Sequence, residues 1–129
     1  MCRRGVVWTG MVIVPNTKGL VIQGVGIDKT IITDDTSIGN PFNRLFDISC
    51  SSVNAPTRLT GFTIKDTGKV DSNAIFAIFG CNNFRVDHNK FENLSSRTMW
   101  LGSKNNTTTY GLVDHNNFIH NIPGSYQGI

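Results

Sequence analysis

The hexapeptide VDHNKF at Val86–Phe91 recurs as VDHNNF at Val113–Phe118, 27 residues later. The same interval leads back from Val86 to the apolar stretch Leu59–Ile64, and a looser copy, Ile22–Ile27, begins 37 residues before Leu59. A fixed period of this length is typical of repeat architectures, in which each repeat is one structural unit stacked on the next. The repeat therefore predicts a stacked fold over most of the chain.

The composition predicts strands and tight turns within each repeat. The 129 residues include 13 Ile, 10 Val, 13 Thr, 14 Asn and 13 Gly, but only 3 Ala, 6 Leu and a single Glu. Branched side chains favour strands, and Asn and Gly favour turns. We expect one domain spanning residues 1–129, truncated at its N-terminus, because the chain enters a strand-like run at Val6–Val14 almost at once.

Each repeat divides into three short strands separated by Gly, Asn or Pro. In the third repeat, Phe84–His88 alternates with Val86 inward and Asp87 outward, and Asn89 fits a bend. Lys90–Leu94 and Thr98–Leu101 supply the second and third strands. Three strands alone bury little, but stacked turns bury a continuous core, with strands about 4.8 Å apart.

The predicted fold is thus an all-β, right-handed parallel β-helix of about four turns. A sandwich or jelly roll also has many short strands, but it does not predict this period. We use "column" for residues at equivalent positions of successive turns. The expected core columns are Ile22–Leu59–Val86–Val113, Ile27–Ile64–Phe91–Phe118, and the pairs Phe46/Ile48, Phe76/Ile78 and Met99/Leu101. Thr36–Arg44 and Lys104–Tyr110 are expected to be surface loops.

The cysteines, the apolar runs and the missing motifs argue against several classes of function. The three cysteines have no metal-binding spacing; Cys50 and Cys81 could bridge adjacent turns, but we expect buried thiols. No apolar run approaches membrane-spanning length, and no secretion signal is visible. Gly24–Thr30 lacks the spacing of a phosphate-binding loop. There is no basic stripe interleaved with aromatic residues, so nucleic acid is not an expected partner. A membrane is not an expected partner either.

The chain resembles the right-handed parallel β-helix proteins of the pectate lyase-like superfamily over roughly residues 8–122. The segments that carry the resemblance are GLVIQGVGIDKTII, RLTGFTIKDTG, NNFRVDHNKFENL and YGLVDHNNFIHNI. The superfamily includes pectate and alginate lyases, tailspikes and surface proteins without known activity. The resemblance implies an acidic polysaccharide as partner, an extracellular or cell-surface location, and lyase-like cleavage if the chain is an enzyme. The alternative is a non-catalytic structural or adhesive solenoid that associates through its open ends.

Outward carboxylates are the first candidate site. Asp87 and Asp114 fall one period apart, and two carboxylates about 5 Å apart repel unless a cation lies between them. Ca²⁺ suits such oxygen ligands. The resemblance implies that calcium held there would bind the substrate carboxylate, whereas the simpler alternative is a solvated pair balanced by Arg85 and Lys90.

Basic and aromatic residues complete the candidates. Arg85, Lys65 and Lys90 are expected near one outer face, and the resemblance implies that an Arg or Lys there removes the C5 proton of a uronate. Trp100 is expected outward, in one column with Asp47 and Ala77, as a sugar platform or packed under a loop.

The histidines of the repeat are the most conspicuous residues but carry a weaker expectation. His88 and His115 should stack, and strand alternation from Val86 points them inward, where they would line a bend. A catalytic or metal-binding pair is the less favoured alternative, because no further zinc ligands are evident.

Overall fold

The computed structural model describes residues 12–16, 18–34, 44–50, 56–66, 74–95, 97–104 and 106–121. These residues form twelve strands and no helix. In chain order the strands are β1 (Val12–Asn16), β2 (Leu20–Gln23), β3 (Ile31–Asp34), β4 (Arg44–Cys50), β5 (Thr57–Thr60), β6 (Thr63–Asp66), β7 (Ala74–Phe79), β8 (Asn82–Asp87), β9 (Lys90–Glu92), β10 (Met99–Gly102), β11 (Tyr110–Asp114) and β12 (Asn117–Ile119).

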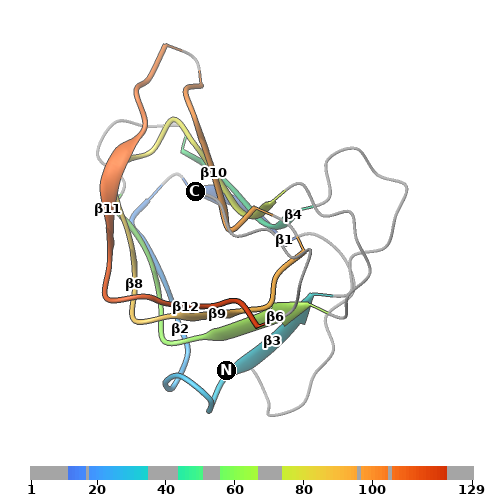
Figure 1. The fold of residues 1–129 in the computed structure, drawn as a ribbon. Helices are drawn as coiled ribbons and strands as arrows, with labels where there is room; N and C mark the ends of the chain where they lie inside the picture. Colours follow the sequence, from blue (N-terminus) through green and yellow to red (C-terminus); the bar gives the residue numbers. More distant parts are fainter. Residues whose placement is uncertain are drawn as a thin grey trace.

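The strands form three parallel sheets of four strands each. The orders are β1-β4-β7-β10, β2-β5-β8-β11 and β3-β6-β9-β12, so every third strand along the chain pairs with the one a turn earlier. Figure 1 shows the three sheets around a closed outline, with β8 and β11 on the left and β3, β6, β9 and β12 along the bottom. This is a parallel β-helix of about four turns, and the predicted fold class is confirmed.

The predicted columns stack in register with one exception, and two of their members on the last turn, Leu101 and Phe118, are exposed and do not belong to the core. The first column pairs Ile22 with Leu59, Leu59 with Val86, and Val86 with Val113. The third joins Phe46 to Phe76 and Met99, and Ile48 to Ile78 and Leu101. Leu59, Val86, Ile48, Phe76 and Ile78 are fully buried, so stacking of identical positions creates a dry interior.

The exception is Ile27, which was predicted to lie in the second column. Ile32, not Ile27, pairs with Ile64, and Ile27 is exposed in the turn between β2 and β3. The separation Ile22 to Leu59 is 37 residues, whereas Ile32 to Ile64 is 32. The first turn is therefore longer at this one corner, and the extra residues moved the strand boundary past Ile27.

Asparagines form a ladder at the corner between the second and third sheets. The Asn89 amide is fully buried; its Oδ1 accepts from the Phe62 backbone N–H at 3.1 Å, and its Nδ2 donates to the Leu59 carbonyl at 3.1 Å. Asn116, one turn later, repeats this by donating to the Val86 carbonyl at 2.8 Å. Each amide satisfies backbone groups that the corner removes from the sheets.

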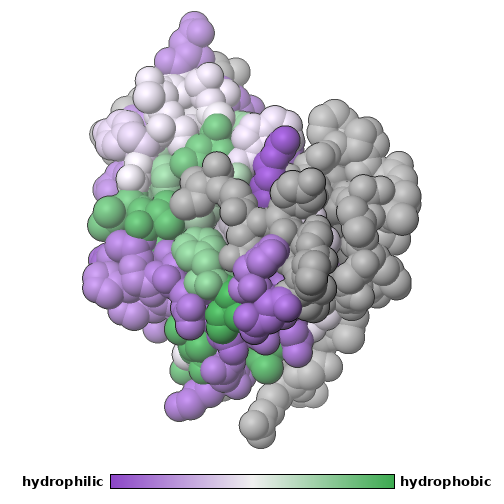
Figure 2. Space-filling view, in the orientation of Figure 1, coloured by the Kyte–Doolittle hydropathy of each residue, from purple (hydrophilic) through white to green (hydrophobic). Residues whose placement is uncertain are grey.

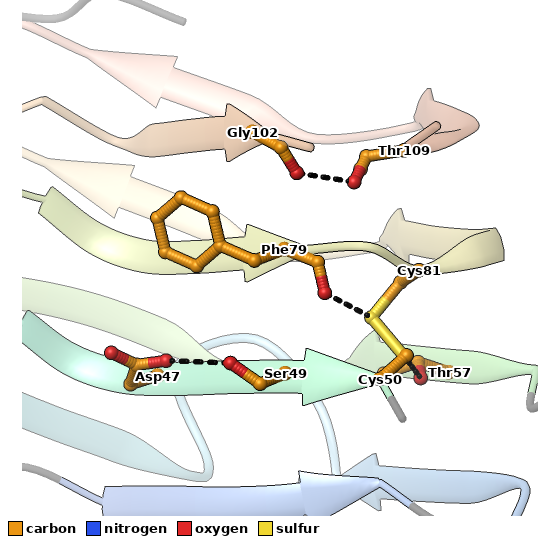
Figure 3. Close-up of a disulfide and its surroundings, with 8 residues drawn as sticks. All are labelled: Asp47, Ser49, Cys50, Thr57, Phe79, Cys81, Gly102 and Thr109. Atoms are coloured by element: carbon orange, nitrogen blue, oxygen red, sulfur yellow. Dashed lines mark hydrogen bonds between the residues drawn. A yellow bond between two sulfur atoms is a disulfide. The ribbon is translucent and has the colours of Figure 1, made fainter. Parts of the chain in front are cut away.

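A disulfide joins Cys50 to Cys81, with Cα atoms 4.9 Å apart. The expectation of buried thiols was wrong, because Cys50 ends β4 and Cys81 follows β7, and register places the two on adjacent turns at strand spacing. Figure 3 shows the bond crossing between the two turns, with the Thr57 hydroxyl 3.9 Å from the Cys50 sulfur. The bond covalently links the second turn to the third.

Apolar side chains are also exposed, mainly on the outermost strands. Those on the last turn are Leu101, Tyr110, Leu112 and Phe118, and those near the first include Ile13, Val21 and Ile31. Figure 2 shows apolar residues in green running through the described part of one face, flanked by hydrophilic residues. The described residues contain no helix that could span a membrane. Most of Val6–Val14 and of the predicted loop Thr36–Arg44 lies outside the described residues.

Candidate functional site

The histidines point outward, which corrects the inward prediction. His88 and His115 have positive φ angles of 53° and 52°, and their side chains are 56% and 67% exposed. A left-handed residue interrupts strand alternation, so His88 leaves the interior and Asn89 takes the inward position. The sequence predicted the bend at Asn89, whereas the structure has it at His88, one residue earlier.

The carboxylates of the repeat lie on the outer face of the sheet of β5, β8 and β11, each held by an arginine one turn earlier. Arg58 donates from Nε and Nη2 to the two oxygens of Asp87, at 2.8 and 2.5 Å. Arg85 donates in the same way to Asp114, at 2.9 and 2.7 Å. Each arginine therefore reaches one period plus two residues forward, which makes the two ion pairs copies of one another.

Each carboxylate also accepts from the histidine that follows it. Nδ1 of His88 lies 2.7 Å from Asp87, and Nδ1 of His115 lies 2.7 Å from Asp114. The side chain of Asp87 has no exposed surface, although it stands on an outer face. We call Arg58, Arg85, Asp87, Asp114, His88 and His115 the Arg–Asp–His row.

The electrostatics of the row follow from these bonds. Hydrogen bonds from Arg58, and secondarily from His88, outweigh desolvation and hold the pKa of Asp87 at about 2, below its usual 3.8. Arg85, then His115, lowers the pKa of Asp114. Conversely, Asp87 raises the pKa of Arg58 and Asp114 raises that of Arg85. The cation between the carboxylates is thus a guanidinium, and a calcium ion at Asp87 and Asp114 would have to displace it.

The three basic candidates occupy two different sheets. Arg85 belongs to the Arg–Asp–His row, whereas Lys65 and Lys90 lie on β6 and β9 of the neighbouring sheet. Lys90 bonds Asp28 at 3.0 Å and Glu92 at 3.4 Å, and the bond to Asp28 is the main reason that its pKa is raised. Lys65 pairs in register with Glu92 and is exposed. The structure does not bring the three together around one point.

Trp100 lies on the outer face of the sheet of β4, β7 and β10. Its predicted column with Asp47 and Ala77 is confirmed. The Trp100 ring meets the Phe79 ring edge-to-face, with centroids 5.9 Å apart. Arg44 places its guanidinium carbon 4.8 Å from the Trp100 centroid and 4.9 Å from that of Phe79.

We call Arg44, Asp47, Phe79 and Trp100 the aromatic platform. Arg44 also bonds Asp47 at 2.5 Å, and Trp100 keeps 37% of its surface exposed. Gly102 makes room for the platform, since a Cβ there would lie 2.6 Å from the Phe79 ring. Figure 3 shows Phe79, Asp47 and Gly102 on neighbouring strands. The arrangement offers a partly exposed aromatic edge beside the carboxylate of Asp47, with the Arg44 guanidinium buried behind them.

Sequence reasoning missed three residues of these groups: Arg58, Arg44 and Phe79. Arg58 precedes Arg85 by one 27-residue period, a signal that was present but unused. Phe79 follows Ile78, which was expected inward, so strand alternation was an unused signal that Phe79 lies outward. Arg44 reaches its partners by side-chain length, which the repeat does not encode.

No protein-family model matches this chain, and the curated proteins and the solved structures contain no significant match. The repeat and the sheets therefore define a class, the parallel β-helix, and no family.

Proposed function

We propose that this chain is a carbohydrate-binding β-helix that holds an acidic polysaccharide on the aromatic platform. The observation that carries the proposal is the partly exposed edge-to-face pair Phe79–Trp100 beside the charged pair Arg44–Asp47. Sugar rings present apolar C–H faces that pack on aromatic rings, and hydroxyls that donate to a carboxylate such as Asp47.

Two further properties support an acidic glycan in an extracellular setting. The chain carries a net charge of +3, which favours association with a polyanion. The Cys50–Cys81 disulfide is typical of proteins that work in oxidising compartments, such as the cell exterior. Both agree with the pectate lyase-like resemblance in the repeats, which we retain as part of the proposal.

Binding without cleavage is the version that the geometry favours. A lyase needs an unprotonated base that accepts the C5 proton, yet ion pairing raises the pKa of both Arg85 and Lys90 and so favours their protonated forms. Lys65, the third candidate, lies on a different sheet from the Asp87–Asp114 pair proposed to hold calcium. Cleavage and Ca²⁺ binding at that pair therefore remain the second part of the proposal, and are tested separately.

Affinity electrophoresis through gels that contain polygalacturonate, alginate, chondroitin sulfate or a neutral glucan tests the proposal. We expect retardation by an acidic glycan and roughly tenfold weaker binding for Trp100→Ala, since an aromatic contact contributes about 1 kcal/mol or more. Tyr110→Ala, which removes an exposed aromatic of another sheet, is the matched control. Equal retardation of all three proteins, or none by any glycan, would refute the platform.

Repeating the assay with Ca²⁺ and with chelator tests the calcium part, and absorbance of unsaturated products tests cleavage. Calcium-dependent product that disappears in Asp87→Asn would establish a lyase and overturn our preference for binding alone. No product from any of the uronate polymers, with binding intact, supports the non-catalytic version.

A structural or adhesive solenoid is the second candidate, favoured by the exposed apolar residues on its outermost strands. Leu112 and Phe118 are 53% and 39% exposed on the last turn, and Val21 is 61% exposed on the first. Apolar end strands with unpaired edges favour end-to-end stacking of copies. Sedimentation over a concentration series tests this, because stacking predicts a mass that rises with concentration.

A further inference from the structure

The outward turn of the histidines gives the repeat a surface that its sequence did not predict. The rings of His88 and His115 stack with centroids 5.0 Å apart and an interplanar angle of 1°. Both side chains are more than half exposed. Two imidazoles thus stand side by side in solvent, on adjacent turns of a rigid scaffold.

The carboxylates fix which ring nitrogen carries the proton. Asp87 and Asp114 are each held by two hydrogen bonds from an arginine guanidinium, and each accepts a further bond from the Nδ1 atom of the next residue. In a neutral imidazole, Nδ1 therefore carries the proton and donates it to the carboxylate, and Nε2 keeps its lone pair. Neither Nε2 bonds to another residue of the described part of the chain.

A carboxylate behind Nδ1 is the arrangement that orients histidine ligands in metalloproteins. It fixes the ring, selects the Nε2 lone pair and makes that nitrogen a stronger donor. Here the orienting group is itself fixed, since Arg58 holds the buried Asp87 and Arg85 holds Asp114. The two positive and two negative charges balance, so the row presents no net repulsion to a cation.

We propose that His88 and His115 bind one divalent transition-metal ion through their Nε2 atoms. Imidazole nitrogens suit Cu²⁺, Ni²⁺ and Zn²⁺, and Cu²⁺ binds most tightly at a site of given ligands. Ca²⁺ prefers oxygen ligands, so it is not expected to bind to the two imidazoles. Because the described residues contain no cluster of three or more His, Cys, Asp or Glu side chains that would hold a metal, solvent or an external ligand completes the coordination.

Binding requires both rings to rotate, because an imidazole lone pair lies in the plane of its ring and the two ring planes are parallel. Metal–nitrogen distances of about 2.1 Å place two ligand nitrogens of one ion at most about 4.2 Å apart. The ring centroids are 5.0 Å apart, so the rings tilt toward each other at their Nε2 edges. Both side chains are more than half exposed, which leaves room for this rotation.

Isothermal titration of the metal-stripped full chain with Cu²⁺ and with Zn²⁺ tests the proposal. All proteins carry Cys2→Ala, so that this thiol contributes no ligand. We expect one ion per chain, at least tenfold weaker binding for His88→Ala and for His115→Ala, and unchanged binding for the control His120→Ala. Asp114→Asn, which disturbs the positioning carboxylate, should weaken binding about 10- to 100-fold.

The copper spectrum distinguishes metal coordination by the two histidines from a purely structural role of their stacking. Electron paramagnetic resonance of the one-equivalent Cu²⁺ complex should show hyperfine coupling to two imidazole nitrogens, and to one in either alanine variant. Circular dichroism confirms that each variant is folded. No binding by the parent protein, equal loss in His120→Ala, or one-nitrogen coupling in the parent protein would each overturn the site. Retained glycan binding by His88→Ala would show that the two sites are independent.

Discussion

Removal of the Cys50–Cys81 bond should produce a large and calculable loss of stability. The bond closes a loop with a sequence separation of 31 residues. For such a loop, the loop-entropy relation predicts that the bond lowers the entropy of the unfolded chain by about 12 cal/mol/K. This raises the free energy of the unfolded state by about 3.7 kcal/mol at room temperature. For a domain whose total stability lies in the usual range of about 5–15 kcal/mol, this is a large fraction.

Urea denaturation measures the effect. We compare Cys2→Ala with the triple variant that also carries Cys50→Ala and Cys81→Ala, so no thiol can form another pair. With a dependence of about 2 kcal/mol/M, the midpoint should fall by about 1.8 M. The parent protein treated with reductant should shift to nearly the same midpoint, whereas the triple variant should not respond to reductant.

Two results would refute the reasoning. A midpoint that moves by less than about 0.5 M would mean that the bond adds little to the native contacts of the two turns. A Cys2→Ala protein whose midpoint does not respond to reductant would show that the Cys50–Cys81 bond does not supply the stability assigned to it. Agreement between the reduced parent protein and the triple variant is needed before the loss is assigned to this bond.

Three further predictions concern the scaffold. Val86→Asp places a charge in a dry column and should abolish cooperative unfolding by circular dichroism, whereas Leu112→Asp on the exposed face should change stability by less than about 0.5 kcal/mol. Asn89→Ala leaves a buried N–H and carbonyls unpaired and should cost about 2–4 kcal/mol in urea, and a smaller loss would mean that water replaces the amide. The pKa of Asp87 is lowered to about 2 in the folded protein, so ionised Asp87 increases the free energy of unfolding. This contribution is fully present above its unfolded-state pKa of 3.8 and is lost as the pH falls through about 2. Midpoints measured across this range should fall toward pH 2 in the parent protein and by less in Asp87→Asn, which keeps the contribution of Asp114; parallel curves would contradict the cause.

The sequence was sufficient for the core because the columns depend only on period and alternation. Val86 and Val113 are the same residue type one period apart, so assigning one of them to the interior also assigned the other. The prediction for Ile27 was wrong because the spacing of the repeat changes at the longer corner of the first turn. A repeat rule holds within strands of constant length, and a corner insertion shifts every assignment that follows it on that turn.

The corner residues were mispredicted for a different physical reason. Alternation assumes extended backbone, but His88 adopts φ of 53°, and one left-handed residue exchanges the inward and outward positions. The sequence allowed either His88 or Asn89 to take that conformation. The choice depends on which side chain better satisfies the buried corner, and the amide of Asn89 offers both a donor and an acceptor to the backbone.

The first turns show that the fold does not require the aspartate and the histidine. Thr60 stands in register with Asp87, and Gly61 follows it at the same corner with φ of 80°, yet the strands stack there equally well. A glycine is also the less strained choice for a left-handed residue. The Asp–His dipeptide therefore adds something to the last two turns beyond stacking. What it adds is an oriented pair of imidazoles in solvent. Because stacking of the turns does not require this pair, we place a metal site there.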